Sequence, residues 1–236
     1  MKMIRRIAIL FFIGFIGGVA MACNTSDESL NHSDEVVDMK EVSLFTAIKN
    51  NNLTAVKQLI ESEVDIEQRN EKGETPLMYA VYLERNAIGK ILIESGADVN
   101  AQDKVLNSPF LYAGAEGNLE IVQLSLENGA NFSVFNRYNG SALIPAAEKG
   151  HVEVVKLLVN YPDYPIDHIN RLGWTALIEA IVLSNGGAVH IQIVDELIKG
   201  GVNVNIPDAD GITPLQHAQQ RNYTSIVKLL KTAGGK

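Results

Sequence analysis

The side chains that most often carry out catalysis or bind metals are spread thinly through this sequence. The chain has five histidines and one cysteine, and no two of them have the i, i+4 spacing that places two metal ligands on one helix face. Asp208, Asp210 and Gly211 have the spacing of the start of a calcium loop, but no glutamate follows at its twelfth position. We therefore predict no catalytic residue, cofactor or metal site. An enzyme is the competing hypothesis, and it would need a pocket in which His168 or His190 meets carboxylates.

The only cysteine, Cys23, lies between an apolar segment and a polar one. A single cysteine cannot form an intramolecular disulfide, and a lone thiolate does not make a zinc or iron–sulfur site. Three basic residues precede an apolar run from residue 7 to residue 22, which is shorter than the roughly 20 residues of a membrane-spanning helix. This order is typical of a secretory signal. Residues 1–22 are therefore predicted to be a signal peptide.

The residues before Cys23, Ala20-Met21-Ala22, resemble the bacterial lipobox, although the usual leucine at the first of these positions is Ala20 here. The resemblance implies that Cys23 becomes the first mature residue and carries lipid. An ordinary signal peptidase cutting after Ala22 would instead release a soluble protein, and a retained membrane helix is a third alternative. Every alternative exports the rest of the chain. We predict lipidation at Cys23 and anchoring in the cell membrane or outer membrane, with the folded part in the periplasm or at the cell surface.

Residues 23–40 are predicted to be a disordered tether. From residue 24 to residue 40 there are five acidic side chains, one basic side chain and no apolar periodicity. The whole chain has a formal net charge of −8, and it becomes more acidic when the basic leader is removed. This charge argues against non-specific binding of DNA or RNA and against docking on anionic lipid. Membrane contact is therefore expected through the N-terminal lipid alone.

A sequence pattern recurs six times through residues 41–236. Its first position falls at residues 42, 75, 108, 141, 175 and 213. A large apolar residue follows two positions later, at Leu44, Leu77, Phe110, Leu143, Leu177 and Leu215. An alanine follows five positions later, at Ala47, Ala80, Ala113, Ala146, Ala180 and Ala218. A second apolar stripe with a spacing of three comes later in each copy. Each copy is therefore predicted to contain two short helices that pack closely at the alanine.

This pattern resembles the ankyrin repeat, Asp-x-x-Gly-x-Thr-Pro-Leu-His-x-Ala-Ala. The resemblance implies an all-α solenoid of about six helix-turn-helix units with short β-hairpin-like loops, at residues 41–69, 70–102, 103–135, 136–169, 170–207 and 208–236. The chain departs from the family where Leu106 and Asn139 replace the turn glycine. Because leucine tolerates the left-handed backbone region poorly, we expect the loop of the third copy to be distorted.

The resemblance also implies a binding surface made of loop tips and first helices. Arg171 and Trp174 stand out because Trp, Tyr and Arg are common in interface hot spots, and Trp174 occupies a position expected to be exposed. The alternative is that Trp174 only covers the neighbouring loop. Two irregular segments, residues 160–168 and 183–190, are predicted to flank this surface, either as binding elements or as neutral insertions. The candidate partner-binding residues are Arg137, Tyr138, Arg171, Leu172, Trp174, Lys104, Asn107, Tyr82, Glu148 and Lys149.

We interpret the chain as a non-catalytic, monomeric protein-binding module displayed in the bacterial cell envelope. Its role would be that of an accessory or scaffold for a partner protein, whose identity the sequence does not contain. An immunity protein that neutralises an envelope-acting toxin is the alternative.

Overall fold

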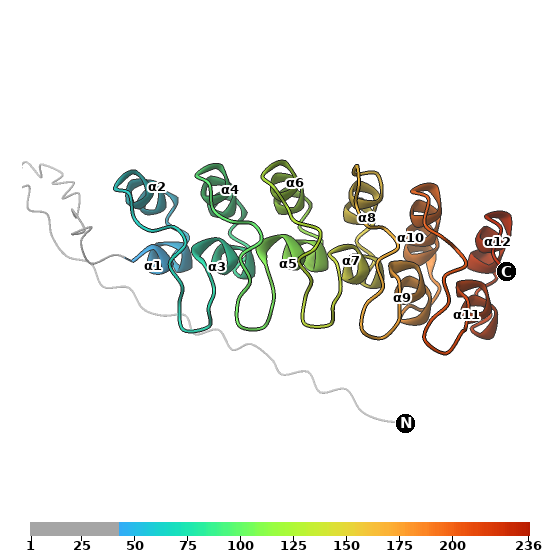
Figure 1. Cartoon of the computed structure of the whole chain (residues 1–236). Helices are drawn as coiled ribbons and strands as arrows, with labels where there is room; N and C mark the ends of the chain where they lie inside the picture. The colour runs from blue at the N-terminus through green and yellow to red at the C-terminus, as the bar shows by residue number, and fades with distance from the viewer. Residues whose placement is uncertain (1–42) are drawn as a thin grey trace, which may run out of the picture. The chain divides into compact units, whose positions relative to one another are not determined.

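The computed structural model describes residues 43–236, so the predictions for the signal peptide, for Cys23 and for the tether lie outside the described residues. The described part forms twelve helices and no strand. The helices stack in two rows, with the first helix of each pair in one row and the second in the other (Figure 1). They are α1 (Leu44–Lys49), α2 (Leu53–Glu61), α3 (Pro76–Tyr82), α4 (Asn86–Glu94), α5 (Pro109–Glu116), α6 (Leu119–Glu127), α7 (Leu143–Lys149), α8 (Val152–Val159), α9 (Ala176–Val182), α10 (Ala188–Lys199), α11 (Pro214–Gln220) and α12 (Thr224–Thr232).

The first helices begin where a hydroxyl side chain caps them. Ser43, Thr75, Ser108, Thr175 and Thr213 each accept a hydrogen bond from the amide three residues later. Such a cap stabilises a helix by about 1 kcal/mol. Apart from Ser43, which lies one residue later, these are the recurring first positions of the sequence pattern, so a serine or threonine sets the start of five of the six first helices. The exception is α7, which has no side-chain cap.

The core lies between the two rows, as the repeated columns predict. Every alanine of the five-position column is at most 1% exposed, and the large apolar residues beside them are buried. Close approach explains this choice of small residues. At Gly114, for example, an added Cβ would lie 2.7 Å from the Cβ of Ala142 on the next repeat. The predicted all-α solenoid is therefore confirmed, and its stacking depends on small residues where helices meet.

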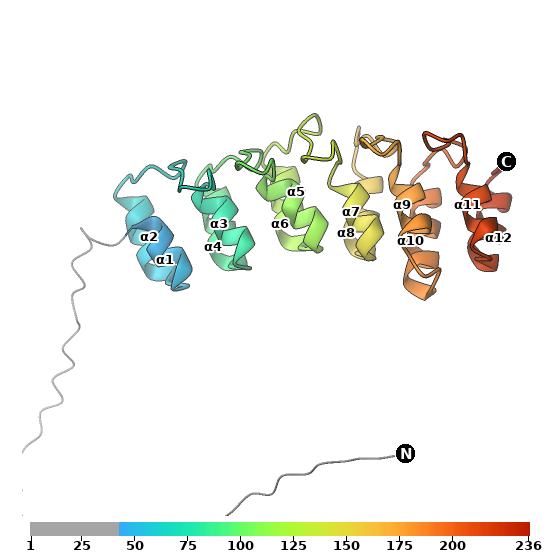
Figure 2. The same cartoon turned by 90° about the horizontal axis from the view of Figure 1, so that it is seen from below.

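Long loops join each second helix to the next first helix and run along one edge of the stack (Figure 2). Neighbouring loop tips are tied by backbone hydrogen bonds. The amide of Lys104 donates to Lys72 O at 3.1 Å, and the amide of Arg171 donates to Tyr138 O at 2.9 Å.

The predicted distortion of the third loop was wrong. Leu106 adopts φ +61°, close to the φ of +77° at Gly73 in the preceding loop. Its amide donates to Asp103 O at 3.1 Å, and the amide of Gly73 makes the equivalent bond to Asn70 O at 2.9 Å. The leucine therefore accepts an unfavourable backbone conformation because the loop on each side holds it there.

The segment 160–168 is packed into the solenoid. Tyr164 is 6% exposed, its ring lies 4.9 Å from that of Phe132, and its hydroxyl accepts a hydrogen bond from the amide of Leu143 at the start of α7. Tyr161 donates its hydroxyl proton to Leu126 O at 3.2 Å. This segment, which we call the aromatic loop, therefore uses its tyrosines to join two repeats.

The segment 183–190 connects α9 to α10, at the helix ends away from the hairpin loops. Tyr223 donates its hydroxyl proton to Ser184 O at 2.6 Å, and His190 Nε2 donates to Glu148 O at 2.7 Å. The insertion thus contacts the repeats on both sides of its own. None of the helices between residues 43 and 236 combines the length and apolar character needed to cross a membrane.

Candidate functional site

A groove of about 380 Å³ runs between the first helices and the loop tips of the third, fourth and fifth repeats. Its wall on the helix side comes from α5, α7 and α9. Apart from Ile144, which lies three positions after the start of the repeated pattern, the side chains there lie four, seven and eight positions after it, which places them on one helix face. They are Tyr112, Ala115, Glu116, Pro145, Glu148, Lys149, Glu179 and Leu183.

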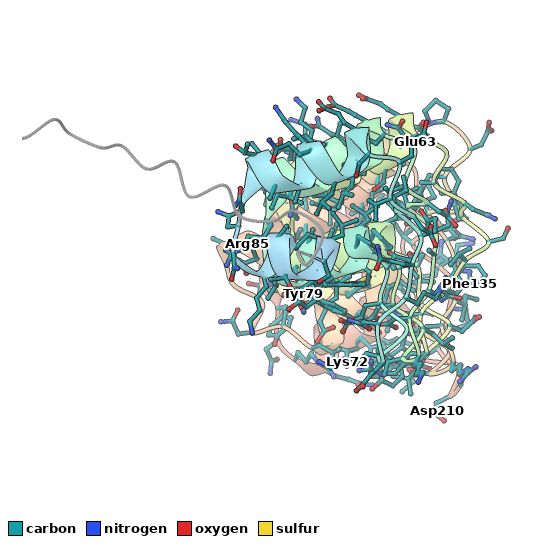
Figure 3. All side chains as sticks on the ribbon, turned by 90° about the vertical axis from the view of Figure 1, so that its left-hand side faces the viewer. Glu63, Lys72, Tyr79, Arg85, Phe135 and Asp210 are labelled. Carbon is teal, nitrogen blue, oxygen red and sulfur yellow. The ribbon has the colours of Figure 1, made fainter. Side chains whose placement is uncertain are left out.

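Figure 3 shows the direction of this face in an equivalent repeat. Tyr79 of α3 occupies the four-position slot, as Tyr112 and Glu179 do in their own repeats. Its side chain lies below the row of first helices, on the side toward which the loop of Lys72 extends (Figure 3). The groove is therefore the inner corner between helices and loops.

Exposed apolar side chains form the loop-side rim of the groove. Tyr138 and Leu172 come from adjacent loop tips, and each is 55% exposed. The guanidinium of Arg137 lies 4.8 Å from the centre of the Tyr138 ring, within the range of a cation–π contact. Leu183 is also exposed and lies on the helix side. Three large apolar side chains thus border one groove without being buried by the fold.

The floor of the groove holds a buried acid, Glu179, which is 6% exposed. Asn170 Nδ2 donates to Glu179 Oε1 at 2.7 Å and fixes its position. Burial raises the pKa of Glu179 to about 7, and the negative charge of Glu148 raises it further, while the bond from Asn170 opposes the shift. Near neutral pH this carboxyl is therefore poised between its neutral and charged forms.

Basic side chains lie along the loop tips outside the floor. Lys104 Nζ donates to Glu71 O at 2.7 Å, and Arg171 Nη1 donates to Arg137 O at 2.8 Å. Each bond uses one donor of its cation and leaves others exposed to solvent. Lys104, Arg137 and Arg171 therefore form a cationic row at the tips, separated by the apolar rim from the acids of the helix face.

The groove contains six of the ten predicted binding residues. They are Asn107, Arg137, Tyr138, Glu148, Lys149 and Leu172. Lys104 and Arg171 contribute to the loop tips instead. Tyr82 makes structural bonds, since its hydroxyl donates to Asp103 Oδ2 at 2.6 Å and accepts from Asn107 at 2.9 Å. Trp174 is half-buried rather than exposed, and it does not line the groove.

Sequence reasoning missed Glu179, Tyr112 and Pro145. The helix residues that it selected, Tyr82, Glu148 and Lys149, lie seven or eight positions after the start of the repeated pattern. The missed residues lie four positions after that start, one turn earlier on the same face. Helical spacing applied one turn further would have found all three.

Within residues 43–236, three of the four histidines make hydrogen bonds inside the fold, and the fourth, His151, has a buried Nε2 without a partner. His168 stacks on Phe135 with ring centres 4.1 Å apart, and its Nε2 donates to Asn139 O at 2.7 Å. His217 Nε2 lies 2.7 Å from Asp208 Oδ2 in a buried pair. No cluster of three metal-ligating side chains occurs within residues 43–236. The convergence of His168 or His190 with carboxylates that an enzyme would need is not seen, because both imidazoles contact backbone carbonyls.

Comparison with known proteins gives one consistent family. A family model described as ankyrin repeats (3 copies) matches residues 20–103 and 110–208. The crystal structure of an ankyrin repeat domain from Acinetobacter baumannii AYE is 48% identical in sequence to this chain, with a TM-score of 0.79. The match covers 82% of this chain and 98% of the Acinetobacter chain. The ankyrin repeat protein EF0377 has 39% identity and a TM-score of 0.77, covering 80% and 96%.

Two further similarities are more limited. The ankyrin repeat domain of Bcl-3 has 23% identity and a TM-score of 0.73 over 83% of this chain and 87% of its own, which is a likeness of fold alone. The ankyrin repeat protein YahD of Escherichia coli K12 is 38% identical over 77 residues, which are 33% of this chain. The match spans only 38% of YahD, well under half of that relative.

Proposed function

Because the chain belongs to the ankyrin repeat family, whose repeats are protein-interaction modules, we propose that it binds a partner protein in the groove of repeats three to five. Binding is stoichiometric and non-catalytic, and the groove is formed before the partner arrives. The partner places a segment between the loop tips and the helices α5, α7 and α9.

The apolar rim of the groove is the observation that carries this proposal. Tyr138, Leu172 and Leu183 are all about half exposed, and they border one groove. Single exposed apolar residues are ordinary, but a group around a concave surface with a charged border is typical of an interaction site. Tyrosine and arginine, which meet here at Tyr138 and Arg137, are also frequent in interface hot spots.

The experiment is crosslinking in intact cells followed by capture of the full chain. A Tyr138→Ala, Leu172→Ala double variant is expected to lose the partner that the wild type captures. Ile169→Ala is the matched control, since Ile169 is similarly exposed but does not line the groove. A partner that stays bound to the double variant, while the variant remains folded, would show that the groove is not the binding surface.

We further propose that the protein is exported and acts in the cell envelope as an accessory or scaffold, held by lipid on Cys23. The support is the sequence alone, a basic and apolar leader followed by Ala20-Met21-Ala22 and Cys23. A tether of residues 24–40 would reach on the order of 20–25 Å as a coil, which separates the solenoid from a membrane surface. Mass spectrometry of the mature N-terminus tests this, and an unmodified Cys23 would refute the anchor.

A further inference from the structure

We propose that the bound segment inserts one lysine or arginine side chain, flanked by apolar residues, into the groove so that its cation meets the carboxylate of Glu179. The inference rests on the proposed function of the groove and names the chemistry of its partner.

The position of Glu179 favours a cationic ligand. It is almost fully buried on the floor of an open groove, and Asn170 satisfies only one of its two carboxylate oxygens. A carboxylate can accept several hydrogen bonds, and no bond to Oε2 is found within residues 43–236, so the group retains capacity for a ligand in the groove that it lines. A buried charge without a counter-ion is costly, and a cation from outside would remove that cost.

Other acids on this side of the solenoid have a basic partner, unlike Glu179. Glu116 pairs with Lys149 at 2.7 Å, and the buried Glu74 lies 4.0 Å from Lys72. Within residues 43–236, neither Glu179 nor Glu148 forms an ion pair with any basic side chain. The fold therefore supplies a basic partner for Glu116 and Glu74. It supplies none for Glu179 and Glu148, which both line the groove.

The effect of Glu148 on Glu179 supports the same conclusion. Burial raises the pKa of Glu179, and the negative charge of Glu148 raises it further, so the two acids lie close enough for one to act on the other. A cation placed between them would interact favourably with both carboxylates.

The surroundings favour a single cation flanked by apolar side chains. Tyr138, Leu172 and Leu183 offer apolar contact on both sides of the floor. The tip cations Lys104, Arg137 and Arg171 would repel a polybasic segment. The groove volume of about 380 Å³ suits a few side chains rather than a folded domain. The chain's own tether, with five acids and one base, has the wrong charge to be the occupant.

The test begins with a random peptide library displayed on phage and selected against the immobilised full chain. Peptides that fail to bind the Tyr138→Ala, Leu172→Ala variant are kept as groove-dependent. Their affinities are then measured by fluorescence anisotropy for the wild type, for Glu179→Gln and for Glu74→Gln. The last is a matched control, because Glu74 is also buried and is also bound by an asparagine, Asn70, at 2.6 Å.

We expect the groove-dependent peptides to share a lysine or arginine between apolar residues. Glu179→Gln should weaken their binding about tenfold or more, and Glu74→Gln should leave it within about twofold. Replacing the peptide's cation by norleucine should cost as much on the wild type and nothing further on Glu179→Gln, which is the signature of a direct pair.

Two outcomes would contradict these proposals, and the experiment tells them apart. If groove-dependent peptides lack a cation, or bind Glu179→Gln as tightly as the wild type, the cation inference is wrong and the groove function stands. If no selected peptide depends on Tyr138 and Leu172, both the inference and the proposed function fail.

Discussion

The groove and the aromatic loop use the same residue types for different purposes. In the aromatic loop, Tyr164 is buried against Phe132 and its hydroxyl bonds the first amide of α7. In the groove, Tyr138 is mostly exposed, and its ring contacts only the guanidinium of its neighbour Arg137 among the aromatic and cation–π contacts of the described residues. Length alone therefore does not make a loop a candidate binding element, because the aromatic loop packs into the fold, whereas an aromatic side chain that the fold leaves unpacked is such a candidate.

The largest expected effect is a loss of stability on replacing Tyr164, which replacing Tyr138 should not cause. Tyr164→Ala should lower the free energy of unfolding by about 3–5 kcal/mol, because it opens a cavity beside Phe132 and leaves the amide of Leu143 without its partner. Tyr138→Ala should change it by no more than about 0.5 kcal/mol. Urea unfolding of both variants measures this, and equal losses would remove the distinction between the two regions.

The next effect concerns the buried acid of the groove. The folded-state pKa of Glu179, about 7, lies above its ordinary value of 4.5, so the folded protein holds a proton that the unfolded chain has released. Stability should therefore fall as pH rises from about 4.5 to about 7. Glu179→Gln cannot ionise and should be more stable than the wild type by about 1–3 kcal/mol at pH 8, with little difference at pH 4.

Thermal unfolding at the two pH values measures that difference. Glu74→Gln is the control and should show no gain at pH 8, because Glu74 already has Lys72 at 4.0 Å. A Glu179→Gln variant without a gain at pH 8 would mean that the groove does not disfavour this charge.

The smallest expected effect is a change of stability on replacing residues with left-handed backbone in the loops beside the groove. Leu106 holds a left-handed conformation that costs a leucine roughly 1 kcal/mol, so Leu106→Gly should stabilise the protein by about 0.5–1 kcal/mol. Asn139→Gly, at φ +57° in the next loop, should gain less because asparagine tolerates this region. Chemical denaturation compares the two, and a loss of stability on Leu106→Gly would show that the leucine side chain packs favourably.

The short-range patterns in this sequence were sufficient to predict the architecture. The alanine column and the apolar residue three positions before it recur in register in all six copies, and both describe contacts between neighbours in a stack. Such contacts repeat with the sequence, because each unit meets only the units on either side. The candidate surface could be approximated for the same reason, and six of its ten residues do line the groove.

The tertiary structure alone decided the remaining features. Leu106 follows the geometry of the loops beside it instead of its own preference, and Trp174 becomes half-buried although its slot suggested exposure. Glu179 looks like any acidic residue of a helix until α7, α9 and the loop of Asn170 close around it. A periodic sequence determines which elements form and stack. The burial of one side chain, and hence its charge and its use, depends on the neighbours that the whole stack brings to it.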